Sequence, residues 1–326
     1  MKVLIVKTSS LGDVIHMLPA VTDAARAVPQ LRVDWLVEES FASIPAWHPA
    51  INRVIPIAMR RWKKQLAKSH TWRQIGAART AMRETAYDLV IDSQGLLKSA
   101  LWSWMARGPG VGYHRTSARE PLASFFYERG FIVSQQLHAI ERNRHLMALA
   151  LDYRVCSAAP DYGLQCLSAR LHTPGITLPP KTVIGLHATS RADKLWPTMN
   201  WQALAHTLGH AGFHLALPWG NDEERLRAEE ISAWAPQALV LPKLGLDALA
   251  SLIDQSVAVV GVDTGLLHLA AALGKPGLAL YTSTLPALTG AVSDRHAAAP
   301  LVNLSGEQAL EAPAVIRALM MALQKG

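Results

Sequence analysis

Two turns between an apolar strand and a helix carry the side chains best suited to chemistry. The first, Ser9-Ser10-Leu11-Gly12-Asp13, follows the apolar residues 3–6 and precedes an apolar helix that begins near residue 14. The second, D-T-G-L-L-H at 263–268, follows the apolar residues 257–262. Open α/β sheets bind ligands at the carboxyl ends of their strands. The sequence therefore predicts one site in each half of the chain, facing a shared cleft.

The first turn supports two interpretations of Asp13. Aspartate is a favoured residue at the start of a helix and needs no further role there. The helix dipole also lowers the pKa of a carboxyl at this position, which weakens it as a base. A base in a closed cleft need only be ionised and aimed at the hydroxyl that it activates. From the residues alone, helix capping is the better interpretation.

The second turn has the features of a phosphate site. The expected helix starts at Thr264 and Gly265. Their backbone N–H groups, together with the threonine hydroxyl, can bind an anion there. Neither a Walker motif nor G-x-G-x-x-G occurs. Asp263 could also simply cap the helix, and His268 could be an interior histidine.

Residues 187–197 leave the expected first strand of the second half. Thr189, Ser190 and Lys194 offer two hydroxyls and an ammonium group, which could clamp a diphosphate. The alternative is a solvated loop that Trp196 anchors.

A basic run, Arg60-Arg61-Trp62-Lys63-Lys64, could hold the phosphates of an anionic lipid or of RNA. Arg115 and Arg119 could extend it. The alternative is a solvated face. Residues 1–170 contain 22 basic and 13 acidic side chains, whereas residues 171–326 contain 10 and 12. This asymmetry favours an anionic partner for the first half.

The composition predicts a folded protein of two domains, since the chain has 326 residues, 50% hydrophobic and 17% charged. The two cysteines match no zinc spacing, and no metal-binding motif is present. We expect no signal peptide and no transmembrane helix.

Apolar and polar periodicity predicts strands that alternate with helices, as in a parallel α/β fold. The expected strands are 3–7, 32–38, 53–57, 88–92, 182–187, 213–217, 257–262 and 278–281. The expected helices are 74–86, 96–107, 199–211, 222–233, 246–255, 266–273 and 307–323. The domains are expected at 1–170 and 182–326, with a linker at 171–181. The last helix could pack on either domain.

Seven segments, in order along the chain, resemble the bacterial lipopolysaccharide heptosyltransferases. They are 3–19 (V-L-I-V-K-T-S-S-L-G-D-V-I-H-M-L-P), 53–64, 91–99 (I-D-S-Q-G-L-L-K-S), 118–127 (A-R-E-P-L-A-S-F-F-Y), 187–197, 217–220 (L-P-W-G) and 262–269 (V-D-T-G-L-L-H-L). The basic run and the 118–127 segment resemble the type that acts first on the inner core.

The resemblance implies a GT-B architecture: two Rossmann-like domains, with the acceptor bound by the N-terminal one and the donor by the C-terminal one. It implies inverting, metal-independent transfer of L-glycero-D-manno-heptose from ADP-heptose to the inner Kdo sugar of Kdo-bearing lipid A. It further implies a location at the cytoplasmic face of the inner membrane. We expect a monomer without a cofactor, peripheral on that anionic surface. No nucleic acid partner is expected.

The resemblance also assigns roles to residues. Asp13 would be the general base, and Lys194 would stabilise the leaving diphosphate. Donor binding would involve Thr189, Ser190, Lys194, Asp263, Thr264, Gly265, Leu266 and His268. Acceptor binding would involve Ser9, Ser10, Gly12, Arg60, Arg61, Lys63, Lys64, Gln94 and Arg119. After the W-G pair at 219–220 the chain departs from the family pattern, so the acid for the donor ribose is Glu223 or Glu224, with Asp222 also open.

Three alternatives accompany this interpretation. One is another heptosyltransferase of the same family. A sugar-nucleotide epimerase or hydrolase on the same fold would turn over without an acceptor. A non-catalytic module that binds RNA would need a platform of several aromatic residues, which the single basic run lacks.

Overall fold

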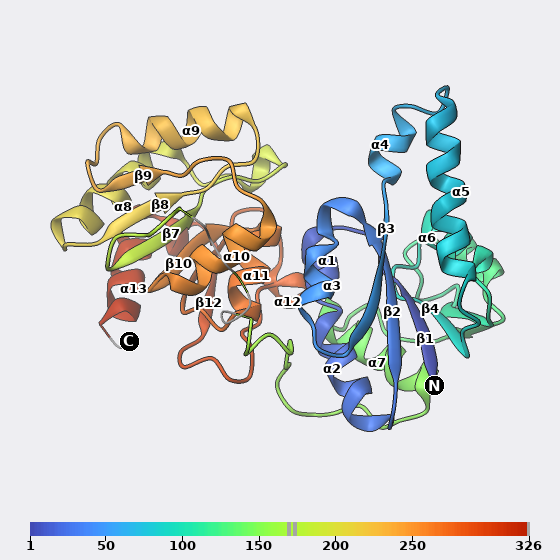
Figure 1. The fold of residues 1–326 in the computed structure, drawn as a ribbon. Coiled ribbons are helices and arrows are strands. Elements are labelled where there is room, and N and C mark those ends of the chain that lie inside the picture. Colours follow the sequence, from blue (N-terminus) through green and yellow to red (C-terminus); the bar gives the residue numbers. More distant parts are fainter. Residues whose placement is uncertain (168–170, 172–174, 325–326) are drawn as a thin grey trace. The chain divides into compact units, whose positions relative to one another are not determined.

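The computed structural model describes residues 1–167, 171 and 175–324, and it divides into two compact units, Met1–Gly163 and Leu164–Gly326 (Figure 1). Residues 172–174 of the expected linker lie outside the described part of the chain. Among the described residues, no helix combines the length and apolar character needed to cross a membrane.

The first unit is built on a parallel sheet of six strands in the order β3-β2-β1-β4-β5-β6. The strands are β1 (Lys2–Val6), β2 (Arg32–Glu38), β3 (Ile51–Ile57), β4 (Leu89–Asp92), β5 (Gly110–Tyr113) and β6 (Arg129–Phe131). The helices are α1 (Leu11–Ile15), α2 (Leu18–Ala27), α3 (Ser43–Trp47), α4 (Met59–Lys63), α5 (Ser69–Arg83), α6 (Leu97–Met105) and α7 (Ala139–Leu151).

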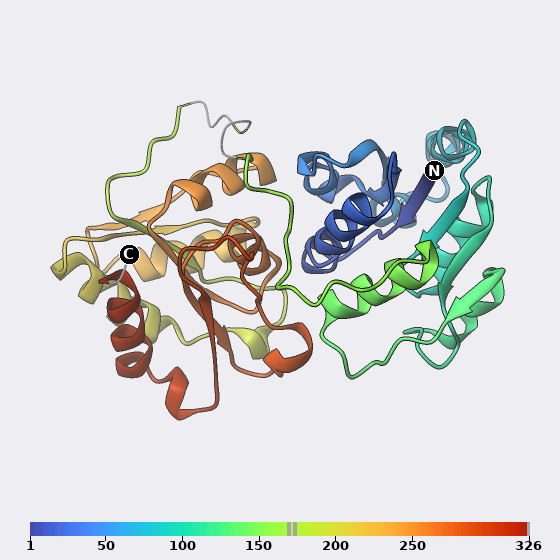
Figure 2. The ribbon, with the colours of Figure 1, turned by 90° about the horizontal axis from the view of Figure 1, so that it is seen from below.

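Helices cover both faces of this sheet, so β1 is buried on both sides after its first residue. Leu4 and Val6 of β1 pack in one core with Met82 of α5 and Trp102 of α6. Figure 1 shows α5 and α6 on one side of the sheet and α2 and α7 on the other. Figure 2 shows α7, in green, running beside α2, in blue, and these two helices pack together.

The second unit repeats the design, with the strand order β12-β11-β10-β7-β8-β9, again parallel. Its strands are β7 (Thr182–Leu186), β8 (His214–Leu217), β9 (Ala238–Val240), β10 (Ala258–Val262), β11 (Gly277–Tyr281) and β12 (Leu301–Ser305). Its helices are α8 (Thr198–His210), α9 (Asp222–Ser232), α10 (Leu246–Gln255), α11 (Gly265–Ala272), α12 (Pro286–Thr289) and α13 (Ala312–Leu323). The last helix, α13, packs on α8 and β11 of this same unit.

Both sheets have the strand order of a doubly wound fold, and this order marks where ligands bind. The order reverses between β1 and β4 in the first sheet and between β7 and β10 in the second. At each reversal the two outgoing connections run in opposite directions and leave a crevice at the carboxyl ends of the strands. The two turns predicted to bind ligands, 9–13 and 263–268, both lie at such a point.

The predicted α/β fold is confirmed, and the eight predicted strands all occur, with no end shifted by more than two residues. Strands β5, β6, β9 and β12 and helices α3, α4, α7 and α12 were not predicted. The helix expected to begin near residue 14 is divided into α1, which starts at Leu11, and α2. The helix predicted at 307–323 is interrupted: the 3₁₀ turn Gln308–Leu310 precedes α13, which begins at Ala312. Pro313 explains this start, because proline fits the first turn of a helix but not its interior.

Candidate active site

In the first unit, the loop after β1 is fastened to the loop after β4 by one glutamine. The Oε1 atom of Gln94 accepts hydrogen bonds from the backbone N–H of Thr8 (2.7 Å) and from its hydroxyl (2.8 Å). The Gln94 amide nitrogen donates in return to the backbone carbonyl of Ser9. Gln94 is buried, so the structure uses its side chain to hold the turn in place. Its predicted contact with an acceptor remains a prediction.

Asp92, at the end of β4, fixes the backbone of the turn that carries Gln94. One carboxylate oxygen accepts the N–H groups of Gln94 (2.8 Å) and Gly95 (3.2 Å), and the other accepts the hydroxyl of Tyr127 (2.7 Å). Burial raises the pKa of Asp92, and these hydrogen bonds oppose that shift. The φ of Gly95 is +67°, and a side chain there would press on Tyr113 at 3.3 Å, so this turn favours glycine.

Asp13 is the third residue of α1, and it caps the helix. Its Oδ2 atom accepts the backbone N–H of Ser10 (2.8 Å) and the Ser10 hydroxyl (3.0 Å). These bonds satisfy a donor at the helix start and fix the direction of the carboxylate. The side chain is 29% exposed. The capping interpretation is therefore correct in geometry, and it leaves room for a second role.

Cations surround the Asp13 carboxylate. Arg119 Nη1 lies 3.8 Å from its Oδ2 atom, and Lys7 is buried close by, where its ammonium donates to the Ser93 carbonyl (2.8 Å). Burial alone would raise the pKa of Asp13, but Lys7, the Ser10 N–H and Arg119 outweigh it and hold that pKa below its ordinary value. Asp13 is consequently ionised at neutral pH.

Lys98 belongs to this site and was missed by the sequence analysis. Its ammonium lies 3.4 Å from the hydroxyl of Ser9, although the two residues are 89 positions apart in the chain. The signal was present, since Lys98 follows the turn after β4 at the switch point of the sheet. The strand order, which reveals that neighbourhood, could not be read from the sequence.

The basic run forms α4 and its C-cap after β3, and its members differ in their surroundings. The Arg61 guanidinium donates two hydrogen bonds to the Glu39 carboxylate, from Nε to Oε1 at 3.0 Å and from Nη2 to Oε2 at 2.9 Å. The Arg60 guanidinium lies over the ring of Phe41 at 5.1 Å. Lys63 and Lys64 are exposed. Arg61 is thus held by a carboxylate, and the exposed lysines are better placed to bind a ligand anion.

In the second unit, Asp263 at the end of β10 organises the predicted donor residues. Its Oδ2 atom accepts the Lys194 ammonium (2.6 Å) and the Thr284 hydroxyl (2.7 Å). His268 Nε2 lies 3.9 Å from its Oδ1 atom. The Asp263 backbone carbonyl accepts the hydroxyl of Thr189 at 3.3 Å. The structure therefore brings Thr189, Lys194 and His268 together, and it adds Thr284, which the sequence analysis did not select.

The anion-binding elements of this cluster are the lysine and the start of α11. Lys194 is held by Asp263 with its side chain 17% exposed. Thr264 is the N-cap of α11, and its side chain makes no capping hydrogen bond. Thr264, Gly265 and Leu266 are each partly exposed. The first turn of α11 therefore offers N–H groups to an anion next to a fixed ammonium group.

The three acidic residues after β8, which are the candidates to bind the donor ribose, differ in their hydrogen bonds and exposure. Glu224 is occupied in capping α9, since its carboxylate accepts the Gly220 N–H (2.7 Å) and the Asn221 amide (2.9 Å). Asp222 is 91% exposed and lies 3.9 Å from Arg225. Glu223 is exposed as well. Ser190, in the loop after β7, is also exposed.

Comparisons with known proteins decide the family. The model of glycosyltransferase family 9 (heptosyltransferase) matches residues 75–314. The chain is 49% identical over 295 residues to lipopolysaccharide heptosyltransferase 1 of Pseudomonas aeruginosa, which covers 89% of this chain and 81% of that relative. The chain belongs to glycosyltransferase family 9. The predicted enzyme class, a glycosyltransferase, is confirmed.

Two solved structures support the same assignment for this family 9 glycosyltransferase. The Escherichia coli heptosyltransferase WaaC with ADP matches with a TM-score of 0.88 and 40% identity, covering 100% of this chain and 99% of that one. WaaC with ADP-2-deoxy-2-fluoro heptose matches with a TM-score of 0.86 and 40% identity, covering 98% of each chain. These matches confirm the predicted two-domain, GT-B-like fold.

Proposed function

We propose that this family 9 glycosyltransferase moves heptose from ADP-heptose to the inner Kdo sugar of Kdo-bearing lipid A, in assembly of the lipopolysaccharide core. The observation that carries the proposal is the Lys194–Asp263 pair at 2.6 Å beside the first turn of α11, at the switch point of the second sheet. The relatives named lipopolysaccharide heptosyltransferase 1, and the WaaC structures with ADP and a heptose analogue, support the choice of donor.

The donor's diphosphate is the group that this cluster suits. Departure of ADP increases the negative charge on its terminal phosphate, and a fixed ammonium group with backbone N–H donors stabilises that charge. Lys194 and the N–H groups of Thr264 and Gly265 would supply this stabilisation without a metal ion. Thr189, Ser190, Leu266 and His268 complete the donor site.

Glu223 is the best acid for the ribose hydroxyls of the donor. It is exposed, whereas the Glu224 carboxylate already accepts two hydrogen bonds from the start of α9. Asp222 is the remaining candidate, because it also lies at the start of α9.

Asp13 would act as the general base on the acceptor. An ionised carboxylate, fixed by Ser10, would take the proton of the attacking Kdo hydroxyl as the new glycosidic bond forms. Its lowered pKa makes it a weak base toward a free hydroxyl. The proton would therefore move late, when attack on the anomeric carbon has made the hydroxyl acidic. A single displacement of this kind inverts the anomeric centre.

Cations near Asp13 and on α4 would hold the acceptor's anionic groups. Lys98 and Arg119 lie beside the Asp13 turn, at 3.4 Å from the Ser9 hydroxyl and 3.8 Å from the Asp13 carboxylate. Arg60, Arg61, Lys63 and Lys64 would bind the carboxylates and phosphates of the acceptor's Kdo and lipid A groups. Ser9, Ser10 and Gly12 would line the sugar itself. We place the enzyme, as a monomer, at the cytoplasmic face of the inner membrane.

Mass spectrometry of the lipid product tests this function. The enzyme is incubated with ADP-heptose and Kdo-lipid A, and the lipid is expected to gain the mass of one heptose. Release of ADP without any acceptor, and with no heptosylated lipid, would instead identify a hydrolase. The anomeric configuration of the product, read by NMR, tests inversion.

A further inference from the structure

Two neighbouring segments of the first unit expose an apolar face. On α6, Leu97, Leu101 and Trp104 recur at i, i+4 and i+7, and they are 39%, 44% and 65% exposed. This spacing places them on one side of the helix. The 3₁₀ segment Pro121–Phe126, labelled η2, adds Leu122 and Phe125, which are 57% and 80% exposed. We call these five side chains the α6–η2 patch.

The two segments pack side by side, so the patch belongs to one surface. At their starts, the backbone N–H of Leu97 donates to the Glu120 carboxylate at 2.6 Å. Near their ends, Gly110 lies between Ser103 of α6 and Phe126 of η2. A Cβ atom on Gly110 would lie 3.4 Å from the Ser103 hydroxyl and 3.6 Å from the Phe126 carbonyl. Clustered, exposed apolar side chains of this kind mark a surface that binds a partner or a membrane.

The segment of chain that carries the patch is rich in basic residues. Residues 95–132 contain five basic and two acidic side chains. Lys98 lies within α6, and its ammonium group reaches the Ser9 hydroxyl at 3.4 Å. Arg119, immediately before η2, lies 3.8 Å from the Asp13 carboxylate. The starts of α6 and η2, which carry the patch, therefore lie next to the proposed acceptor site.

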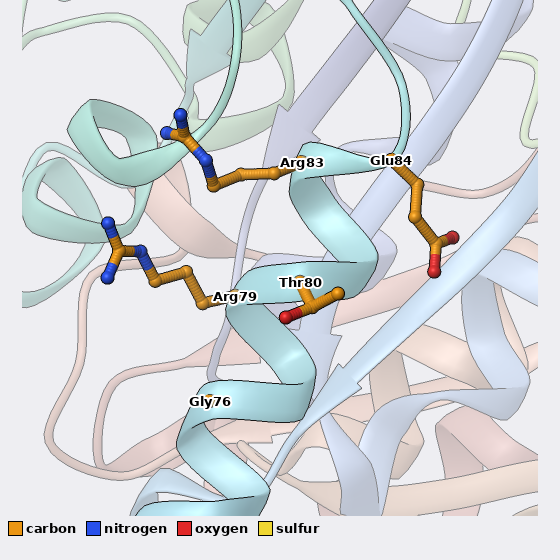
Figure 3. A pocket seen from close by; sticks show the side chains of 5 residues that line it. All are labelled: Gly76, Arg79, Thr80, Arg83 and Glu84. Atoms are coloured by element: carbon orange, nitrogen blue, oxygen red, sulfur yellow. The ribbon is translucent and has the colours of Figure 1, made fainter.

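Helix α5 extends the positive surface beyond the end of α6. Residues 60–83 contain eight basic side chains and no acidic one. Arg79 and Arg83 extend from one side of α5, as Figure 3 shows, and they line an open hollow of about 510 Å³ with Gly76, Thr80 and Glu84. Arg83 donates to the carbonyl of Met105 at 3.0 Å, next to Trp104. The two guanidinium groups are well suited to bind phosphates.

We propose that the α6–η2 patch docks the enzyme on an anionic lipid bilayer. Its leucine, tryptophan and phenylalanine side chains enter the boundary between headgroups and acyl chains, and the arginines of α5 contact lipid phosphates. The proposal extends the proposed function, because an acceptor that carries acyl chains lies in such a bilayer. A second copy of this chain fits the patch poorly, since it would bring the same excess of positive charge.

Flotation with lipid vesicles tests the proposal on the full chain. The wild-type protein is expected to float with vesicles of phosphatidylglycerol and phosphatidylethanolamine, and to stay below with vesicles of phosphatidylcholine alone. The double variant W104S/F125S should lower binding to the anionic vesicles at least about tenfold, because it removes two large apolar side chains from the interface. The matched control is W234S, since Trp234 is a tryptophan in the second unit that is 72% exposed. It should bind as the wild type does.

Several results would overturn the docking surface. One is equal flotation of W104S/F125S and wild type; another is no flotation of wild type with anionic vesicles. A third is a wild-type dimer that W104S/F125S converts to a monomer, because that would identify a contact between copies. Unchanged thermal midpoints of both variants ensure that lost binding is not lost folding.

Transfer to an acceptor sugar without acyl chains separates this proposal from the proposed function. W104S/F125S should transfer to that acceptor at the wild-type rate while it fails to float. A wild-type enzyme that floats but transfers no heptose would refute the proposed function and leave the docking surface supported. A loss of transfer to the acyl-free acceptor in the variant would contradict a docking role, because it would place the patch in the sugar site.

Discussion

Replacing Asp13 by asparagine separates its capping role from its role as a base. Both hydrogen bonds from Ser10 end on one oxygen, Oδ2, at 2.8 and 3.0 Å. The amide oxygen of asparagine can accept both, so the start of α1 should keep its geometry. The substitution removes the negative charge that faces Lys7 and Arg119, and with it the ability to take a proton.

The expected loss in kcat/KM is about 10³-fold, which corresponds to about 4 kcal/mol of transition-state stabilisation. The stability cost should be smaller, about 1–3 kcal/mol, because the buried Lys7 loses a partner charge but keeps its bond to the Ser93 carbonyl. Steady-state release of ADP measures the first quantity, and urea unfolding measures the second. The matched control is S10A, which removes one hydrogen bond but no charge and should reduce activity only a few-fold.

The pH dependence provides a second readout of the same variant. The folded-state pKa of Asp13 lies below its ordinary value of 3.8, so the charged form stabilises the fold above that value. This stability is lost as pH falls through the folded-state pKa. The stability difference between wild type and D13N should therefore be constant near neutral pH and shrink only below about pH 4. Activity of D13N within tenfold of wild type would refute the base role, and so would an S10A variant as inactive as D13N.

Three further variants test the rest of the site. Lys194→Met should raise the KM for ADP-heptose and lower kcat/KM by about 10²–10³-fold, because the phosphate charge that Lys194 binds grows toward the transition state. Steady-state kinetics unchanged from wild type would show that Lys194 is not part of the donor site. Neutralising Arg60, Lys63 and Lys64 together should raise the acceptor KM at least about tenfold and leave ADP binding, measured by calorimetry, intact. A matching loss of ADP affinity would contradict the assignment of these residues to acceptor binding alone. Gln94→Leu should destabilise the first unit by about 2–4 kcal/mol in urea unfolding, since it leaves buried backbone donors without an acceptor; unchanged stability would show that Gln94 does not hold the turn.

The strands with apolar runs rich in Val, Ile and Leu were predictable from the sequence. β1 and β10 are of this kind, because strands buried on both faces of a parallel sheet read as continuous apolar runs. β5, with the sequence G-V-G-Y, was missed because glycine weakens the strand signal. β12 was missed because its outward residues are polar or exposed. Helix α7 was missed because polar and charged residues interrupt its apolar pattern, and two of them, Asn143 and Arg144, are in fact buried.

The candidate site was predictable where the chemistry lies within one turn. The Ser9–Asp13 turn and the start of α11 each place their groups together locally. Relations across the sheet were not predictable. Gln94 reaches back 85 and 86 positions to the β1 loop, and Lys98 reaches back 89. Thr284 joins Asp263 from 21 positions away. Such contacts follow from strand order, which no local pattern specifies.

Acceptor-dependent turnover tests the central claim most directly. ADP release and lipid heptosylation are followed together in time, with ADP-heptose and either Kdo-lipid A or lipid A from which Kdo has been removed. The proposed function predicts equal amounts of ADP and heptosylated lipid with the first acceptor, and neither product with the second. ADP released at the same rate with both acceptors would contradict it.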